Sequence, residues 1–418
     1  MEKRQGLPGT ARLAALLAAV VLIGAGARLG ADTLRQGPAL RTSPGAAAAW
    51  VGTWTASPVA TAAPDGPVGS PAGPGGRTVR NVLHTSIGGT AARITLSNLF
   101  GTAPLDVSSV TLAVRAPGRG AGAALGTLRP VPFAGRQAAT LAPGGMLVSD
   151  PVAFGVPHDG DLLVSIHTPA AADGATTHPR AHQTSYVAEG DRTRDTSGSA
   201  FTSRTPSWHH VTAVDVLTSE ARGAVVAVGD SLTDGAASTP GANARWPDRL
   251  SDRLGGRYAV LNAGISGNRL LTEGRGPGTL DRLDRDVLGR SGVRTVIVAV
   301  GINDLLRSPQ APPAAEVVAG YRRLADRARA RGLRVVGATL APCGGYRNCS
   351  AAVRAARTEV NEAVRRGGIF DAVADFDRAL RDPGDPERLA AAYDSGDHLH
   401  PGDAGYARMS EAVDPEVL

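Results

Sequence analysis

The stretch Ala224-Val225-Val226-Ala227-Val228-Gly229-Asp230-Ser231 joins an apolar, β-rich run to a polar turn. A short run that is apolar throughout is typical of a strand buried on both faces, as in a parallel sheet. Similar runs follow at residues 258–261, 295–300, 333–340 and 370–376, and helical segments lie between them at 245–254, 280–288, 314–331 and 351–366. A further helix is expected after Asp403. This alternation predicts that residues 221–418 form a doubly wound α/β domain, a parallel sheet with helices on both faces.

Residues 50–220 have a different pattern, which predicts an all-β domain. Short β-rich segments such as 93–99, 107–114 and 162–166 are separated by turns rich in Gly and Pro, and no helical period of useful length is present. Many short strands between such turns indicate a β-sandwich or jelly roll. We expect Trp54 and Trp208 in the core of this domain; the alternative is that they are exposed and stack on sugars.

The N-terminus has the features of a targeting segment. Lys3, Arg4 and Arg12 precede an apolar run at 13–25 that small residues follow. This pattern predicts a signal peptide, or an uncleaved signal anchor, over residues 1–31. Residues 32–49 are rich in Ala, Pro and Gly and are interpreted as a linker. The protein is therefore expected to be secreted, or held at a membrane by its N-terminal segment.

The two cysteines fit an exported protein. Cys343 and Cys349 are the only cysteines, and five residues separate them. In an oxidising compartment this spacing favours a local disulfide, and two free thiols are the alternative.

The charge of the chain does not indicate a nucleic-acid partner. The net charge is +6, but the basic residues are scattered among acidic ones, as at 281–286, and aromatic residues make up only 4%. A nucleic-acid surface would require a basic stripe with aromatics. Arg outnumbers Lys 43 to 1, which is interpreted as a codon-composition bias and not as an adaptation for binding.

Four motifs in the C-terminal half carry groups that acyl transfer needs. They are Gly229-Asp230-Ser231-Leu232-Thr233, Asn262-Ala263-Gly264-Ile265-Ser266-Gly267-Asn268, Gly301-Ile302-Asn303-Asp304 and Asp397-His398-Leu399-His400. The first three each follow a predicted strand, and ligand sites of such sheets lie beyond the carboxyl ends of the strands. Together the motifs predict an ester-hydrolysis site.

Ser231 is the candidate nucleophile, and His400 is its candidate base. A hydroxyl needs a neighbouring base, and Asp397 is close enough in sequence to fix the tautomer of His400. A helix cap is the alternative role for Ser231. His398 is the rival base, but it is expected to face the other way. Metal ligation is disfavoured because no third ligand stands at motif spacing, so no metal site is predicted.

Three donors are candidates for an oxyanion hole. They are the N–H groups of Ser231 and Gly267 and the side-chain amide of Asn303. The alternatives are that Gly267 is an ordinary turn glycine and that Asn303 forms an Asx turn or a cap.

These motifs resemble the four blocks of the SGNH hydrolase (GDSL esterase/lipase) superfamily over residue 221 to the C-terminus. The resemblance implies that Ser231 is the nucleophile and first oxyanion donor, that Gly267 and Asn303 complete the hole, and that His400 and Asp397 are the base and its orienting acid. Gly267 is chosen over Gly264 by its Ser-Gly-Asn context. Trp50-Val51-Gly52-Thr53-Trp54 is similar to the start of the β-sandwich that precedes the hydrolase domain in a secreted subgroup. The resemblance implies ester hydrolysis without a cofactor.

We therefore expect a secreted serine esterase that acts on a small or polymer-borne ester. Short acyl esters, including O-acetyl groups of glycans, are favoured because no extended apolar lid-like segment is present and the β-domain is consistent with polymer targeting. The alternatives are a long-chain lipase or lysophospholipase, or an acyltransferase that uses the same acyl-enzyme. A pure glycan-binding module is disfavoured because all the candidate catalytic residues are present. The sequence leaves the oligomeric state open.

Overall fold

The computed structural model describes residues 47–60, 76–118, 120–170, 176–307 and 314–418. The predicted signal segment, residues 1–31, and residues 32–46 of the predicted linker lie outside this part of the chain. None of the helices that the structure describes is both long enough and apolar enough to cross a membrane.

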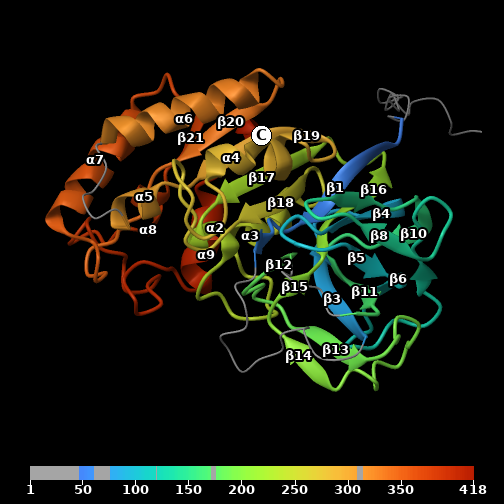
Figure 1. Cartoon of the computed structure of the whole chain (residues 1–418). Coiled ribbons are helices and arrows are strands. Elements are labelled where there is room, and N and C mark those ends of the chain that lie inside the picture. Colours follow the sequence, from blue (N-terminus) through green and yellow to red (C-terminus); the bar gives the residue numbers. More distant parts are fainter. Residues whose placement is uncertain (1–46, 61–75, 119, 171–175, 308–313) are drawn as a thin grey trace, which may run out of the picture. The chain divides into compact units, whose positions relative to one another are not determined.

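The N-terminal half is built around two large antiparallel sheets (Figure 1). One sheet has the order β1 (Ala49–Thr55), β16 (Val211–Thr218), β4 (Gly89–Ser97) and β10 (Val152–Val156), and β9 (Met146–Val148) also pairs with β4. The other has the order β14 (Ser203–Thr205), β13 (Ser185–Glu189), β3 (Arg77–Thr85), β11 (Gly160–Thr168), β6 (Ser109–Val114) and β7 (Arg129–Pro130). Ile94 and Leu96 of the first sheet and Leu83 and Leu162 of the second belong to one buried cluster. This confirms the predicted β-sandwich.

Short strands complete this half of the chain. β2 (Val59–Ala60), β12 (Thr176–His178) and β15 (Trp208–His209) form a small sheet, and β5 (Leu105–Val107) pairs with β8 (Ala139–Leu141). Trp54 and Trp208 are both buried, and their rings meet edge to face with centroids 4.9 Å apart. They therefore belong to the core, as expected, and are not available to stack on a sugar.

The C-terminal half contains a parallel sheet with the order β18 (Ala259–Gly264), β17 (Ala224–Gly229), β19 (Val293–Ala299), β20 (Arg334–Ala338) and β21 (Ala372–Ala374). Alternate side chains of β17 point to opposite faces: Val226 packs in the same cluster as α4 (Thr279–Leu283), α6 (Ala314–Arg329) and α7 (Ala351–Arg365). Val225 packs with α3 (Trp246–Leu254), α8 (Phe376–Leu380) and α9 (Asp403–Glu411). The predicted doubly wound sheet with helices on both faces is confirmed.

Two local predictions need correction. The helix expected at 280–288 is α4 followed by a π-helical turn, Asp284–Leu288, in which Asp286 is buried between arginines. The last strand is shorter than the expected 370–376 because Asp375 caps a new helix: its side chain accepts a hydrogen bond from the Arg378 N–H, and α8 begins at Phe376.

The sandwich and the parallel sheet share one hydrophobic core. Gly52 of β1 lies against the side chain of Leu261 of β18, so closely that an added Cβ would come within 2.8 Å of it. Residues 47–418 accordingly form one compact unit. β16 ends at Thr218 and β17 begins at Ala224, on either side of the expected boundary at residue 221.

The strand order places the motifs at one edge of the parallel sheet. The strand order reverses at β17 and β19, the position at which doubly wound sheets bind ligands beyond the carboxyl ends of their strands. Ser231 follows β17 and Asn303 follows β19, so the fold brings the first and third motifs to this point.

Candidate active site

Ser231 is the first residue of a one-turn helix, α2 (Ser231–Asp234), directly after β17. Asp230 is the cap of this helix, because its side chain accepts a hydrogen bond of 3.1 Å from the Leu232 N–H. The cap that was the alternative role for Ser231 is therefore filled by its neighbour. The Ser231 N–H stands in the first turn, where backbone N–H groups have no partner within the helix.

His400 joins Ser231 to Asp397. Its Nε2 lies 2.9 Å from Ser231 Oγ, and its Nδ1 lies 2.6 Å from Asp397 Oδ2. The other carboxylate oxygen accepts from the backbone N–H groups of Leu399 and His400. Partial burial opposes ionisation of Asp397, but the bonds from His400 and the two N–H groups outweigh it and lower the pKa of the carboxyl. An ionised Asp397 holds the proton on Nδ1 and leaves the Nε2 lone pair for the Ser231 hydroxyl.

His398, the rival base, has a different partner. Its Nδ1 lies 2.6 Å from Asp394 Oδ2, and its backbone has a positive φ of 66°. The segment 394–400 therefore carries two His–Asp pairs, and only the pair of His400 contacts Ser231.

Asn303 presents an unpaired donor. It lies on α5 (Ile302–Leu306), which begins after Gly301 at the end of β19. Its Oδ1 accepts a hydrogen bond of 3.2 Å from Arg307 Nε, and since a guanidinium only donates, this contact fixes which end of the amide is the oxygen. The Nδ2 atom is buried and has no hydrogen-bond partner among the described residues. A buried donor without a partner lowers the stability of the folded protein by about 1–3 kcal/mol unless a ligand accepts its hydrogen bond.

Gly267 lies on the loop after β18 and has a φ of 80°, which glycine adopts without strain. No hydrogen bond within the described part of the chain joins Gly267 to Ser231 or His400. Its loop is instead tied to both neighbours: Asp234 of α2 accepts from the Ser266 N–H, and Asp304 of α5 accepts from the Leu270 and Leu271 N–H groups.

The family of the C-terminal half follows from its sequence. Residues 227–408 match the model of the GDSL-like Lipase/Acylhydrolase family. This part of the chain belongs to that family. The resemblance to the SGNH (GDSL) hydrolases is thus confirmed, and the chain is an ester hydrolase at the level of the family. No curated protein matches the chain.

Solved structures similar to the GDSL-like domain come from several bacteria. One is a lipolytic protein of the G-D-S-L family from Desulfitobacterium hafniense DCB-2, at 24% identity over 46% of this chain and 98% of that chain, with a TM-score of 0.37. Another is a GDSL-like lipase from Bacteroides thetaiotaomicron VPI-5482, at 18% identity over 47% and 87%, with a TM-score of 0.37. A third is a carbohydrate acetylesterase from Sinorhizobium meliloti, at 16% identity over 45% and 95%, with a TM-score of 0.38.

Arg282 binds the carboxyl ends of the two strands in which the first two motifs begin. The sequence does not predict this role. The fully buried guanidinium of Arg282 donates to the carbonyl oxygens of Gly229 and Ala263, at the ends of β17 and β18, and also to Asn268, Asp286 and Ser57. In sequence, Arg282 and Asp286 belong to the mixed charges of residues 281–286, which give no sign of burial. In the structure both are buried, and each is the ion-pair partner of the other.

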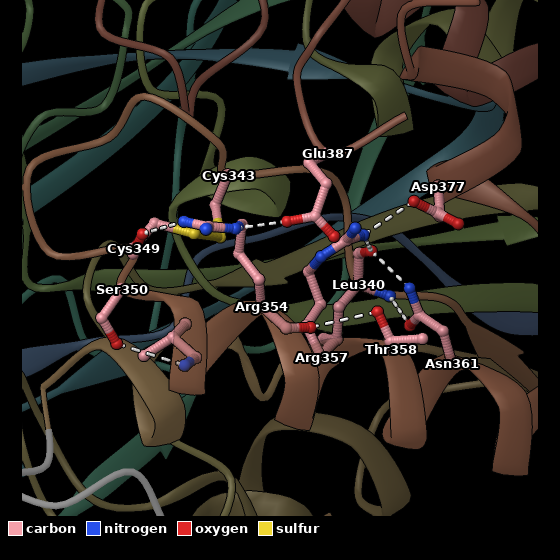
Figure 2. Close-up of a disulfide and its surroundings, with 11 residues drawn as sticks. Leu340, Cys343, Cys349, Ser350, Arg354, Arg357, Thr358, Asn361, Asp377 and Glu387 are labelled. Atoms are coloured by element: carbon pink, nitrogen blue, oxygen red, sulfur yellow. Dashed lines mark hydrogen bonds and ion pairs between the residues drawn. A yellow bond between two sulfur atoms is a disulfide. The ribbon is translucent and has the colours of Figure 1, made fainter. Parts of the chain in front are cut away.

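A disulfide closes the loop between β20 and α7 of the GDSL-like domain, as predicted: Cys343 is bonded to Cys349 (Figure 2). Ser350 follows immediately and caps α7, accepting from the Val353 N–H. Arg354 on the first turns of α7 pairs with Glu387 beside the disulfide.

A cleft of about 610 Å³ lies beside α2 and the loop of Gly267. Its lining comes from the sandwich and from the GDSL-like domain, and includes Phe100, His178, Arg180, Ser266, Glu273 and Arg275. Among the described residues, no three His, Cys, Asp or Glu side chains are placed to hold a metal ion.

Proposed function

We propose that the protein is a secreted serine esterase that forms an acyl-enzyme on Ser231 and cleaves short acyl esters, including O-acetyl esters of glycans. The observation that carries the proposal is the contact of 2.9 Å between His400 Nε2 and Ser231 Oγ, with Asp397 on the other ring nitrogen. A hydroxyl, an imidazole and a carboxylate in this order form a nucleophile with its base and its orienting acid.

The reaction begins when Ser231 Oγ attacks the ester carbonyl carbon and its proton passes to His400 Nε2. The negative charge that develops on the carbonyl oxygen is stabilised by Asn303 Nδ2 and by the N–H groups of Ser231 and Gly267. The unpaired state of Asn303 Nδ2 supports this role, since the oxyanion would supply the missing acceptor.

Collapse of this intermediate breaks the bond to the alcohol, whose oxygen takes the proton from His400. Water then attacks the acyl group on Ser231, with His400 accepting a proton from the water and returning it to the serine. The products are the free acid and the alcohol, and the enzyme is regenerated. Neither step uses a cofactor.

Two features support short acyl groups and a polar alcohol. The large apolar side chains that are exposed in the described residues are Leu125, Met146, Val148 and Val373, and none of them lines the cleft beside α2. The cleft carries the charged side chains of Arg180, Glu273 and Arg275, which suit the hydroxyl groups of a glycan, beside apolar side chains such as Phe100 and Ile265.

The disulfide supports secretion, because such bonds persist in oxidising compartments. Expression of the full chain in a secreting bacterial host checks this part of the proposal. The protein should be recovered from the medium with an N-terminus near residue 31, and full-length protein that stays in the membrane fraction would indicate a signal anchor.

The decisive experiment measures hydrolysis of p-nitrophenyl esters from acetate to palmitate by the protein and its Ser231→Ala variant. The variant should lose several orders of magnitude in kcat. We expect the highest kcat/KM for acetate, and acetate released from O-acetylated glycans without transfer to added sugars. A maximum at long acyl chains would indicate a lipase, and acetyl transfer to the sugars would indicate a transferase. Activity that survives in Ser231→Ala would refute the site.

A further inference from the structure

A histidine of the sandwich contacts the helix that carries the candidate nucleophile. His178 lies at the end of β12, and its Nε2 is 2.9 Å from Oδ1 of Asp234, the last residue of α2. Its Nδ1 is 2.8 Å from the carbonyl oxygen of Ser57. The His178 and Asp234 side chains are 6% and 3% exposed. The contact therefore lies at the wall of the cleft but is almost entirely buried.

The hydrogen bonds limit the charges of this pair to two cases. A carbonyl oxygen only accepts, so Nδ1 of His178 donates to Ser57, and Nε2 either donates to an ionised Asp234 or accepts from a protonated one. The other oxygen of Asp234 accepts from Ser266, as a carboxylate oxygen does. With Asp234 ionised, His178 is an imidazolium, and the two form a buried ion pair with a hydrogen bond at every polar atom.

The electrostatic surroundings agree with this assignment. Burial opposes the protonation of His178, but the charge and hydrogen bond of Asp234 and the Ser57 carbonyl outweigh burial and raise the pKa of His178. Burial likewise opposes the ionisation of Asp234, and His178 outweighs it, so the pKa of Asp234 is lowered. Arg245 and His182 also face the pair; the charge of Arg245 opposes the protonation of His178 and does not reverse it.

Asp234 connects three parts of the molecule. It belongs to the single helical turn that begins with Ser231, and its Oδ1 is hydrogen-bonded to Nε2 of the sandwich residue His178. Its Oδ2 accepts from the backbone N–H of Ser266 at 2.9 Å and from the Ser266 hydroxyl at 2.5 Å. Ser266 immediately precedes Gly267. One carboxylate thus sets the spacing between the nucleophile helix and the loop of the proposed oxyanion donor.

We propose that His178 is a positioning residue of the esterase: through Asp234, the sandwich holds Ser231 and Gly267 in the arrangement that catalysis needs. The inference rests on the proposed function of Ser231. It makes the sandwich part of the catalytic unit and not only a neighbouring module.

The expected consequence is a loss of kcat with little change of KM for a small ester. Without the imidazolium, Asp234 is a buried charge without its cation, and it has to move towards water or take up a proton. Either response displaces α2 from the loop of Gly267, and displacements of about 1 Å at reacting groups cost about 10²-fold in rate.

The test compares His178→Ala, His178→Gln and Asp234→Asn with a matched control, Arg93→Ala. Arg93 belongs to the sandwich and donates to Ser291 Oγ at 2.9 Å, just before β19 and at the opposite edge of the parallel sheet from Ser231. The Arg93→Ala variant therefore breaks a contact between the sandwich and the GDSL-like domain, as His178→Ala does, but at a distance from Ser231. For each full-length variant, kcat and KM are measured with p-nitrophenyl acetate, reactive sites are counted with a fluorophosphonate, and Tm is recorded.

We expect His178→Ala to lower kcat per titrated site by about 10- to 100-fold, with KM changed by less than about threefold. His178→Gln, whose amide can still donate to Asp234, should recover part of the rate. Asp234→Asn should lower kcat, and the double variant with His178→Ala should lose much less than the product of the single losses. Arg93→Ala should lower Tm and leave kcat per site unchanged.

The inference is overturned if His178→Ala keeps the wild-type kcat per site, or if Arg93→Ala loses as much as His178→Ala. If His178→Ala does not fold, an unchanged kcat in both His178→Gln and Asp234→Asn overturns it equally. Failure of the proposed function has a different signature, since Ser231→Ala would then retain activity.

Discussion

The Nε2 atom of His400 lies 2.9 Å from the Oγ atom of Ser231, although 169 positions separate the two residues in sequence. The segment that carries His400 also carries a second pair of the same chemistry, His398 with Asp394. In both pairs an Asp accepts from Nδ1 at 2.6 Å, but only His400 reaches the serine. The pair of His398 and Asp394 therefore serves as a control for the proposed roles of His400 and Asp397.

Asp397→Asn should lower kcat by about 10³- to 10⁴-fold, because an amide can no longer hold the Nδ1 proton and the tautomer of His400 is lost. His400→Gln should lose at least as much. KM for p-nitrophenyl acetate should change little in either variant. The matched variants Asp394→Asn and His398→Gln remove the neighbouring pair and should keep kcat within about threefold of wild type. Equal losses in the two pairs would contradict the assignment of His400 as the base.

The unpaired amide of Asn303 predicts opposite effects on rate and stability. Asn303→Ala should lower kcat by about 10²- to 10³-fold, as expected for the loss of one oxyanion donor. Its stability should be unchanged or higher, because the variant no longer buries an unsatisfied N–H group.

Asn361 is the matched control for Asn303, because its buried amide is fully paired with the backbone of Leu340. Asn361→Ala should lower the free energy of unfolding and leave the rate per titrated site unchanged. Chemical denaturation and active-site titration of both variants check the prediction. A loss of stability in Asn303→Ala with no loss of rate would assign Asn303 a structural role.

The sequence predicts the sheet and its motif-bearing edge because both depend on local features. An apolar run such as 224–228 is long enough only for a strand, and the polar residues of three motifs come directly after such runs. Once the strands are parallel, their carboxyl ends share one edge, so Ser231 and Asn303 meet there. The pairing of His400 with Asp397 is likewise local, since three positions separate them.

The residues that support the site could not be predicted in this way. His178 meets Asp234 across 56 positions, and Arg282 meets Ser57 across 225. Nothing in the local sequence distinguishes Arg282 from exposed arginines such as Arg275 and Arg294, because its burial results from the packing of the sandwich against the parallel sheet. The π-helical turn after α4 could not be predicted for the same reason: it buries Asp286 against the partly buried Arg285 and Arg290, and these contacts exist only in the folded chain.

The disulfide should contribute about 2 kcal/mol to the free energy of unfolding, as expected for a bond that closes a loop of only six positions. The double variant Cys343→Ala/Cys349→Ala should lose about this amount in urea denaturation. Wild-type protein in excess reductant is the matched control, since it loses the bond and keeps both side chains. It should lose a similar amount, and reductant should not affect the double variant. Equal stability of oxidised and reduced wild type would contradict the prediction.

Asp230 should make stability fall as the pH rises towards neutrality. Burial beneath Ser231, with Asp304 and Asp234 nearby, raises the pKa of this carboxyl to about 7, against an ordinary value of 3.8. Between these values the folded protein binds a proton that the unfolded chain has released. Unfolding therefore releases a proton, so raising the pH over this interval favours unfolding and lowers the free energy of unfolding. Asp230→Asn keeps the oxygen that accepts from the Leu232 N–H and cannot ionise.

The Asp230→Asn variant should therefore be more stable than wild type near pH 8, and the difference should shrink towards about pH 4. Urea denaturation of both proteins across this range measures the difference. Asp414 is the matched exposed cap, since it accepts from the Glu416 N–H at 2.9 Å at the surface. Asp414→Asn separates the effect of burying the carboxyl from the effect of replacing a capping carboxylate. A gain in Asp230→Asn that stays constant with pH, or that grows as the pH falls, would show that Asp230 is ionised throughout in the folded protein.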